Sequence, residues 1–87
     1  MPSAEQRTTD ILAGPGGVMT DEVGVVTGDL TLRSELADGR YALAVQYKDA
    51  AEWYRVTGAT ATLAAPEDLD AVHTLAVALL HRADGIA

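Results

Sequence analysis

Cysteine, phenylalanine and asparagine are all absent from this chain of 87 residues. Without cysteine the chain forms no disulfide, no thiolate nucleophile and no cysteine-ligated zinc site. No stretch approaches the roughly 18 apolar residues of a membrane-spanning helix. The polar segment 1–10 also lacks the apolar core of a secretory signal. These absences predict a cytoplasmic protein that does not enter a membrane.

Basic side chains are scarce. Thirteen acidic residues outnumber six basic ones, which gives a net charge of −7, and only Lys48 is a lysine. A negative chain repels nucleic acid and anionic lipid at long range, so we expect neither as a partner. The preference for arginine over lysine, with abundant alanine, glycine and valine, is typical of a GC-rich bacterial genome.

The chain is also short. A domain of this size buries only about 60–65% of the surface that its unfolded form exposes, so its core is thin. Small domains with thin cores often gain stability by associating. The length therefore predicts one small acidic domain, and we expect a homodimer or a complex with a small protein partner.

Residues 1–20 show no hydrophobic periodicity. Gly14-Pro15-Gly16-Gly17 follows the isolated apolar pair Ile11-Leu12, and this combination of glycine and proline normally interrupts regular structure. We therefore predict a flexible N-terminal tail over 1–20 and a single domain over 21–87. In the alternative, Ile11-Leu12 pairs as a short edge strand, and whether the tail orders on binding stays open.

A β-hairpin is the clearest structural prediction. Apolar and polar residues alternate from Val23 to Leu36, and Asp38-Gly39 suits a two-residue turn that needs positive φ at both positions. With that turn, Leu36 faces Tyr41, and the apolar faces of the two strands coincide along their length. A one-residue slip destroys this agreement.

A third strand follows the predicted loop 49–52. This loop pairs Tyr47 with Tyr54 and sends Tyr54 toward the core, while Trp53 and Arg55 point to the opposite face. A loop of three or five residues reverses that assignment.

A C-terminal helix begins at Pro66, which suits the first helical position, with acidic residues in the first turn. It ends with His81 and Arg82 in the last turn and Gly85 as a cap. Its predicted apolar stripe consists of Leu69, Val72, Ala76, Leu79, Leu80 and Ala83, flanked by Leu75 and Val77. We expect the core to contain Leu32, Val45, Val56, Leu79 and Leu80.

Together these elements predict an α+β fold. It is a small two-layer domain in which an antiparallel β-meander of three to four strands carries the C-terminal amphipathic helix on one face.

No catalytic, metal or cofactor motif is visible. Ser34 has no nucleophile-elbow setting and is expected to bond to backbone. His73 and His81 are too far apart on a helix to share an ion, and His73 fits a surface pair with Asp70. The glycines at 14–17 precede neither a clear helix nor a Lys-Ser/Thr pair, so they match no phosphate-binding motif. We expect no catalytic residue, no metal and no cofactor.

The outer face of the sheet offers a candidate binding surface. We predict that Trp53, Arg55, Arg33 and Lys48 contact a partner, because tryptophan and arginine are enriched among the residues that dominate binding energy. The competing explanation is a solvated face with cross-strand pairs, Asp29–Lys48 and Glu35–Arg33. The sequence thus favours a non-enzymatic protein-binding or self-associating regulatory or adaptor module. The alternative is a small nucleic-acid- or ligand-binding domain that uses the open face of the sheet.

Overall fold

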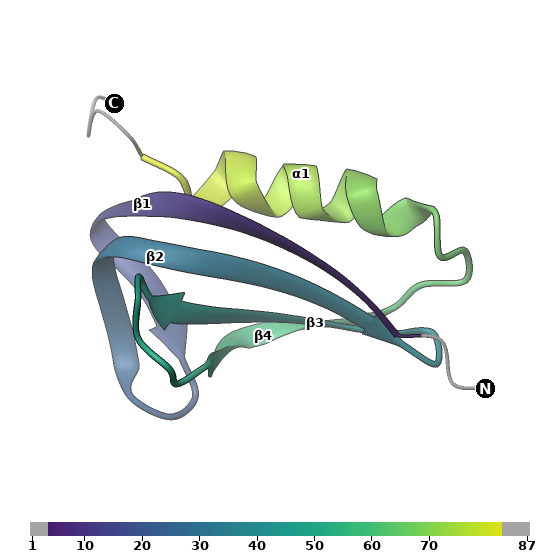
Figure 1. Ribbon diagram of the computed structural model, residues 1–87, viewed down its shortest axis with the longest axis horizontal. Helices are drawn as coiled ribbons and strands as arrows, with labels where there is room; N and C mark the ends of the chain where they lie inside the picture. The colour runs from purple at the N-terminus through teal and green to yellow at the C-terminus, as the bar shows by residue number, and fades with distance from the viewer. Residues whose placement is uncertain (1–3, 83–87) are drawn as a thin grey trace.

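The computed structural model of the protein describes residues 4–82, which form four strands and one helix. The elements are β1 (Ala4–Thr20), β2 (Gly24–Ala37), β3 (Arg40–Tyr47), β4 (Tyr54–Thr62) and α1 (Asp68–Leu80). Each strand pairs antiparallel with the next, and β4 returns to β1 at one pair, Thr20 with Val56, which closes the sheet into a small barrel. The helix runs along β1 (Figure 1). The predicted α+β meander with a C-terminal helix is confirmed.

The β2–β3 hairpin has the predicted register. Ala37 pairs with Arg40 and Leu36 with Tyr41, and the ladder continues to Leu30 and Tyr47. Asp38 and Gly39 have φ angles of 51° and 77°, as a type I′ turn requires. The turn and the two apolar faces specify the same pairing, which explains why the sequence sufficed here.

The predicted flexible tail is wrong for residues 4–20. They form β1, which pairs with β2 from Ala4 opposite Ala37 to Thr20 opposite Gly24. The strand does alternate, but its half-buried positions at the start are polar: Glu5, Arg7 and Thr9. Because their partners lie largely on the helix, no apolar periodicity marks this half of the strand.

The segment Gly14–Gly17 is a bulge inside β1 and does not end the strand. Ala13 pairs with Gly28 and Val18 with Val26, so these four residues stand opposite a single residue of β2. Bulges bend and twist a hairpin. The long β1–β2 hairpin curls here, and its tip reaches β4 (Figure 1).

The register of β4 differs from the prediction by two residues. Tyr54 pairs with Val45 and Arg55 with Ala44, because the loop 48–53 has six residues instead of four. An even shift leaves each side chain on its predicted face, so Tyr54 packs against the core and Arg55 is exposed. A second irregularity between Ala42 and Ala44 shifts the pairing again in the second half of β4.

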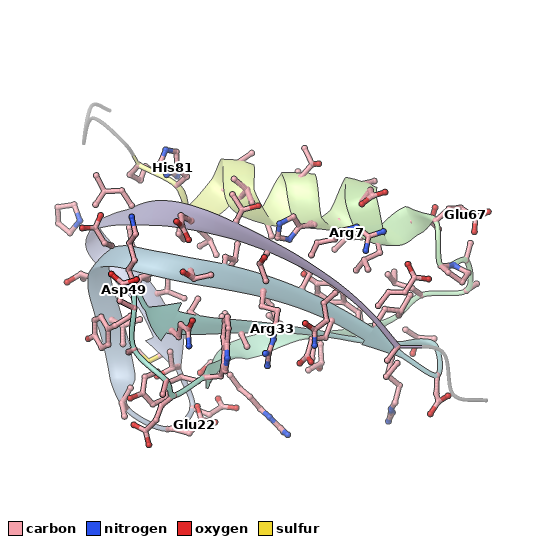
Figure 2. All side chains as sticks on the ribbon, viewed as in Figure 1. Arg7, Glu22, Arg33, Asp49, Glu67 and His81 are labelled. Atoms are coloured by element: carbon pink, nitrogen blue, oxygen red, sulfur yellow. The ribbon has the colours of Figure 1, made fainter. Side chains whose placement is uncertain are left out.

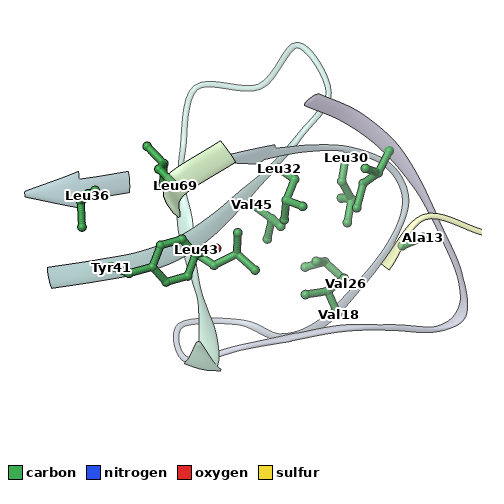
Figure 3. Close-up of a cluster of buried hydrophobic side chains, with 11 residues drawn as sticks. Ala13, Val18, Val26, Leu30, Leu32, Leu36, Tyr41, Leu43, Val45 and Leu69 are labelled. Carbon is green, nitrogen blue, oxygen red and sulfur yellow. The ribbon is translucent and has the colours of Figure 1, made fainter. Parts of the chain in front are cut away.

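The core lies between the curled sheet and α1 (Figure 3). Leu32 and Val45 are fully buried, as predicted, and Val56 and Leu80 pack against the cluster while half-buried. Leu79 is 62% exposed, so its assignment to the core is wrong.

The inward face of α1 is rotated relative to the predicted stripe. It carries Leu69, Val72, His73, Ala76, Val77 and Leu80. The polar His73 occupies a buried position, which pattern reading does not assign to histidine, and this places Leu75 and Leu79 on the exposed side. The helix begins at Asp68, and His81 and Arg82 follow its last residue. Ala83 and Gly85 lie outside the described residues. Within the described chain no helix is long and apolar enough to span a membrane.

Gly17 should be indispensable for the bend in the β1–β2 hairpin. Its φ is +64°, and a Cβ there meets Val25 Cγ1 at 2.5 Å and Val26 O at 2.6 Å. We expect Gly17→Ala to lower the free energy of unfolding by at least about 1–2 kcal/mol in urea denaturation. Gly16→Ala is the control, because a Cβ at Gly16 has nothing within 4 Å. Equal effects of the two variants would contradict the role of Gly17.

A pair of leucines on α1 tests the corrected helix face. Leu69 is fully buried, and Leu79 is largely exposed. Leu69→Ala should cost about 2–4 kcal/mol of unfolding free energy, whereas Leu79→Ala should change it by less than about 0.5 kcal/mol. Chemical denaturation of both variants measures the difference. A large loss of unfolding free energy in Leu79→Ala alone would support the helix face predicted from the sequence.

Candidate functional site

A groove of about 710 Å³ crosses the face of the sheet formed by β2, β3 and β4. It lies over the irregularity between Ala42 and Ala44, where the regular β3–β4 pairing is interrupted. The side chains that give it chemical character are Glu22, Arg33, Glu35, Arg40, Trp53, Tyr54 and Arg55. Glu22 and Arg33 lie on the side of the molecule away from α1 (Figure 2). The groove therefore lies away from α1, although the core residues Tyr41 and Leu43 also line it.

Arg33 and Trp53 lie against each other in the groove. The guanidinium carbon of Arg33 lies 4.0 Å from the centroid of the Trp53 ring, a cation–π contact between β2 and the loop before β4. A terminal nitrogen of Arg33 also lies 3.4 Å from Glu35 Oε1. The predicted Glu35–Arg33 pair therefore forms, but along the single strand β2 and not between strands. Its Nε is buried and has no hydrogen-bond partner among the described residues. Arg33 is thus held in place by Trp53 and Glu35, and the donor that it leaves unpaired is buried.

Arg40 and Arg55 add two cations to the same groove. Neither side chain forms an ion pair within residues 4–82. Arg55 is placed by its backbone: its N–H donates to Glu22 Oε1 at 2.8 Å, and its carbonyl accepts from the N–H of Asp21 at 3.0 Å. The tip of the curled hairpin therefore fixes the start of β4 and leaves the guanidinium free.

Lys48 lies outside this groove. Its Nζ is 3.9 Å from Asp10 Oδ2, and its contact with Asp29 is a backbone hydrogen bond of 3.1 Å. The predicted Asp29–Lys48 side-chain pair is replaced because β1 brings Asp10 beside this position. The groove thus brings together Arg33, Trp53 and Arg55, while Arg40 and Glu22 are lining residues that the sequence did not indicate.

A chain of four polar side chains runs through the core on the other side of the sheet. Thr9 Oγ1 lies 2.8 Å from His73 Nε2, and His73 Nδ1 lies 2.8 Å from Ser34 Oγ. Ser34 Oγ in turn lies 2.9 Å from the hydroxyl of Tyr41. Two expectations are therefore wrong: Ser34 bonds to side chains, and His73 is not paired with Asp70.

The network is satisfied when His73 is neutral, because one ring nitrogen donates and the other accepts. Burial, and next the charge of Arg7, lower the pKa of His73, although Asp70 opposes them. Asp70 itself bonds to Arg7 Nε at 2.6 Å. Burial raises the pKa of Tyr41, and its hydrogen bond with Ser34 offsets part of that rise.

The Ser34–His73 contact has the atoms of a nucleophile and a base but not the access. Ser34 is fully buried and His73 is 8% exposed, and neither lines the groove. Buried polar groups that satisfy one another specify how elements pack. The network joins β1, β2, β3 and α1, so we interpret it as a structural network that holds the helix against the sheet.

Within the described chain, no group of three or more histidine, aspartate or glutamate side chains is arranged to hold a metal ion. His81 Nδ1 instead accepts the N–H of Leu12 at 2.9 Å.

Comparisons with protein-family models, curated proteins and solved structures find no match to the chain. The arrangement of its own residues is therefore the basis for a functional proposal.

His73 should make stability depend on pH. Its pKa is lower in the folded chain than the unperturbed value of about 6.5, so the unfolded state binds the proton more readily. Stability is then lost as pH falls below about 6.5, by at most about 1.4 kcal/mol per pH unit for one group.

Urea denaturation of the wild type and of His73→Gln at pH values on both sides of 6.5 measures this effect. We expect a smaller change with pH in the variant. An equal change in both proteins would assign the pH dependence to other groups.

Proposed function

We propose that this chain is a non-enzymatic binding module that holds an acidic segment of a protein partner in the groove of Arg33, Arg40, Trp53 and Arg55. One observation carries the proposal. Half of the chain's six basic residues line a single groove, although the chain as a whole has a net charge of −7. Such a concentration of cations favours a partner that presents carboxylates there.

The chemistry of the groove suits this role. Trp53 offers a large apolar surface that the stacked Arg33 keeps in one orientation, so less conformational entropy is lost on binding. The guanidinium groups of Arg40 and Arg55 are free to make charge-assisted, two-point hydrogen bonds with carboxylates. Tryptophan and arginine are also the residues most enriched at energetic centres of interfaces.

The two glutamates limit what the groove accepts. Glu35 already pairs with Arg33, and Glu22 is occupied by the backbone of Arg55. Their charges leave only a small positive excess, which favours a short acidic segment over a long anionic chain.

The second candidate is a single-stranded nucleic acid. A tryptophan among arginines is the arrangement on which bases stack, and this observation supports it. A phosphate backbone, however, carries charge along its whole length, so it continues past the groove onto acidic surface. A short protein segment need not carry charge beyond the groove, and for that reason we favour it.

Fluorescence titration tests the proposal directly, because Trp53 is the single tryptophan of the chain. The probes are a short glutamate-rich peptide, a lysine-rich peptide of equal length and a single-stranded oligonucleotide. We expect the glutamate-rich peptide to change the Trp53 emission, with an affinity that falls as salt is added. The lysine-rich peptide should have no effect.

Two arginine variants make the test specific to the groove. Arg55→Ala should weaken binding of the glutamate-rich peptide by about 1 kcal/mol or more. Arg82→Ala removes the same charge outside the groove and should leave binding unchanged. Equal loss of peptide binding in both variants would show that binding depends only on net charge. A stronger response to the oligonucleotide would favour the second candidate.

A further inference from the structure

The strand β4 has a free edge. On one side it pairs with β3, and on the other side only Val56 pairs with β1, at Thr20. Asp21 N–H and Glu22 Oε1 bind the backbone of Arg55 next to that pair. Within the described chain, residues 57–62 have no neighbouring strand on this side.

The alternation of the ladder shows which groups the edge presents. The N–H of Leu63 donates to the carbonyl of Gly39 at 2.8 Å, so the odd-numbered residues of this stretch face β3. Ala61 therefore bonds toward β3, opposite Tyr41. Thr60 and Thr62 direct their N–H and C=O groups to the free edge.

Beyond the hydrogen bond from Thr57 Oγ1 to Asp21 Oδ1 at 2.7 Å, no strand or helix of the described chain covers this edge. The helix lies against β1 and β2 and makes no comparable contact with β4 (Figure 1). None of the nine residues of β4 is buried, whereas β2 and β3 each contain several buried residues. The strand is the least complete part of the barrel.

The other edge of the sheet, formed by the first half of β1, is protected against pairing, in contrast to the edge of β4. The first half of β1 carries charged side chains, and α1 lies beside it. The N–H of Leu12 donates to His81 Nδ1 at 2.9 Å, and its carbonyl accepts from the N–H of Arg82 at 2.7 Å. Natural sheets use charges and covering elements in this way to prevent edge-to-edge pairing. From Val56 to Pro66 the chain has no charged residue at all.

We propose that the free edge of β4 pairs antiparallel with β4 of a second copy of this chain. A chain with net charge −7 repels its own copies, and this uncharged edge is a place where two copies approach with little repulsion. Arg55 precedes the uncharged stretch and Glu67 follows it. In an antiparallel pair, the Arg55 end of each copy faces the Glu67 end of the other, because the interface is two-fold symmetric. The backbone of Arg55 is already bound by Asp21 and Glu22, so the main-chain pairing is confined to residues 57–62.

This inference goes beyond the proposed function, because it concerns the main-chain groups at the edge of β4, whereas the groove is proposed to bind through arginine and tryptophan side chains. The two surfaces adjoin, since Thr60, Ala61 and Thr62 also line the groove. The pairing extends the sheet of each copy through main-chain hydrogen bonds, as in strand addition. The peptide titration reports on the groove and the sedimentation measurement reports on the edge, so failure of one proposal is distinguished from failure of the other.

Amide hydrogen exchange followed by NMR, together with sedimentation, tests the inference on the full chain. At low-micromolar concentration we expect a monomer in which the Thr60 and Thr62 amides exchange quickly and the Ala61 amide slowly. At high-micromolar concentration we expect a dimer in which the exchange of Thr60 and Thr62 slows at least tenfold. Ala61 is the internal reference, because its amide is bonded to β3 in both states.

Two variants separate the edge from other routes of association. Thr60→Pro removes an edge N–H without touching the bonds to β3 and should shift the dissociation constant at least tenfold upward, with thermal unfolding checked in parallel. Thr62→Glu should do the same by placing like charges across the two-fold axis. Thr74→Glu adds the same charge on the exposed side of α1 and should have a small effect.

Three outcomes would overturn the inference. The first is a monomer at every concentration. The second is a dimer in which Thr60 and Thr62 still exchange quickly, which would place the interface elsewhere. The third is protection of these amides only when another protein is added, which would mean that a different protein binds the edge.

Discussion

The pairing of β2 with β3 across the Asp38–Gly39 turn decides what every other part of the molecule does. It directs Leu30, Leu32, Ser34 and Leu36 to the inner side and Arg33 and Glu35 to the outer side. A slip of one residue exchanges the two sets. The hydrophobic core, the polar network and the groove are therefore consequences of one register, which is why it is specified twice, by turn chemistry and by apolar pattern.

The sequence was sufficient where local and long-range signals coincide, and insufficient where structure depends on a distant partner. The hairpin is an example of the first case. The strand β1 is an example of the second, because Arg7 and Thr9 are ordered by Asp70 and His73, more than 60 positions away along the chain. Polar residues whose partners lie so far apart produce no periodic signal. The helix face was misassigned for the same reason, since a buried histidine is recognised only when its hydroxyl partners are known.

The candidate groove was predictable in part. The faces of Trp53 and Arg55 depend only on whether the β3–β4 shift is odd or even, and the shift of two residues left them unchanged. Glu22 joins the groove because the bulge at Gly14–Gly17 curls the hairpin until its tip meets β4, and no local pattern indicates such a bend. The prediction for Lys48 was wrong because residues 4–20 were predicted to be a tail. They form β1, and β1 places Asp10 next to Lys48.

Tyr41 connects the two polar regions of the protein. Its hydroxyl ends the buried chain that runs through Ser34 and His73, while the same residue contributes to the wall of the groove. Replacing such a network by apolar side chains is often neutral or stabilising, so its value lies in specifying one arrangement and not in raw stability. Because the network anchors α1 and β1 at one end and Tyr41 at the other, it fixes the β3 wall relative to the rest of the barrel. A wall held in one position keeps the backbones of Arg33 on β2 and Arg40 on β3 at a constant separation, and the proposed binding of carboxylates depends on such a constant separation.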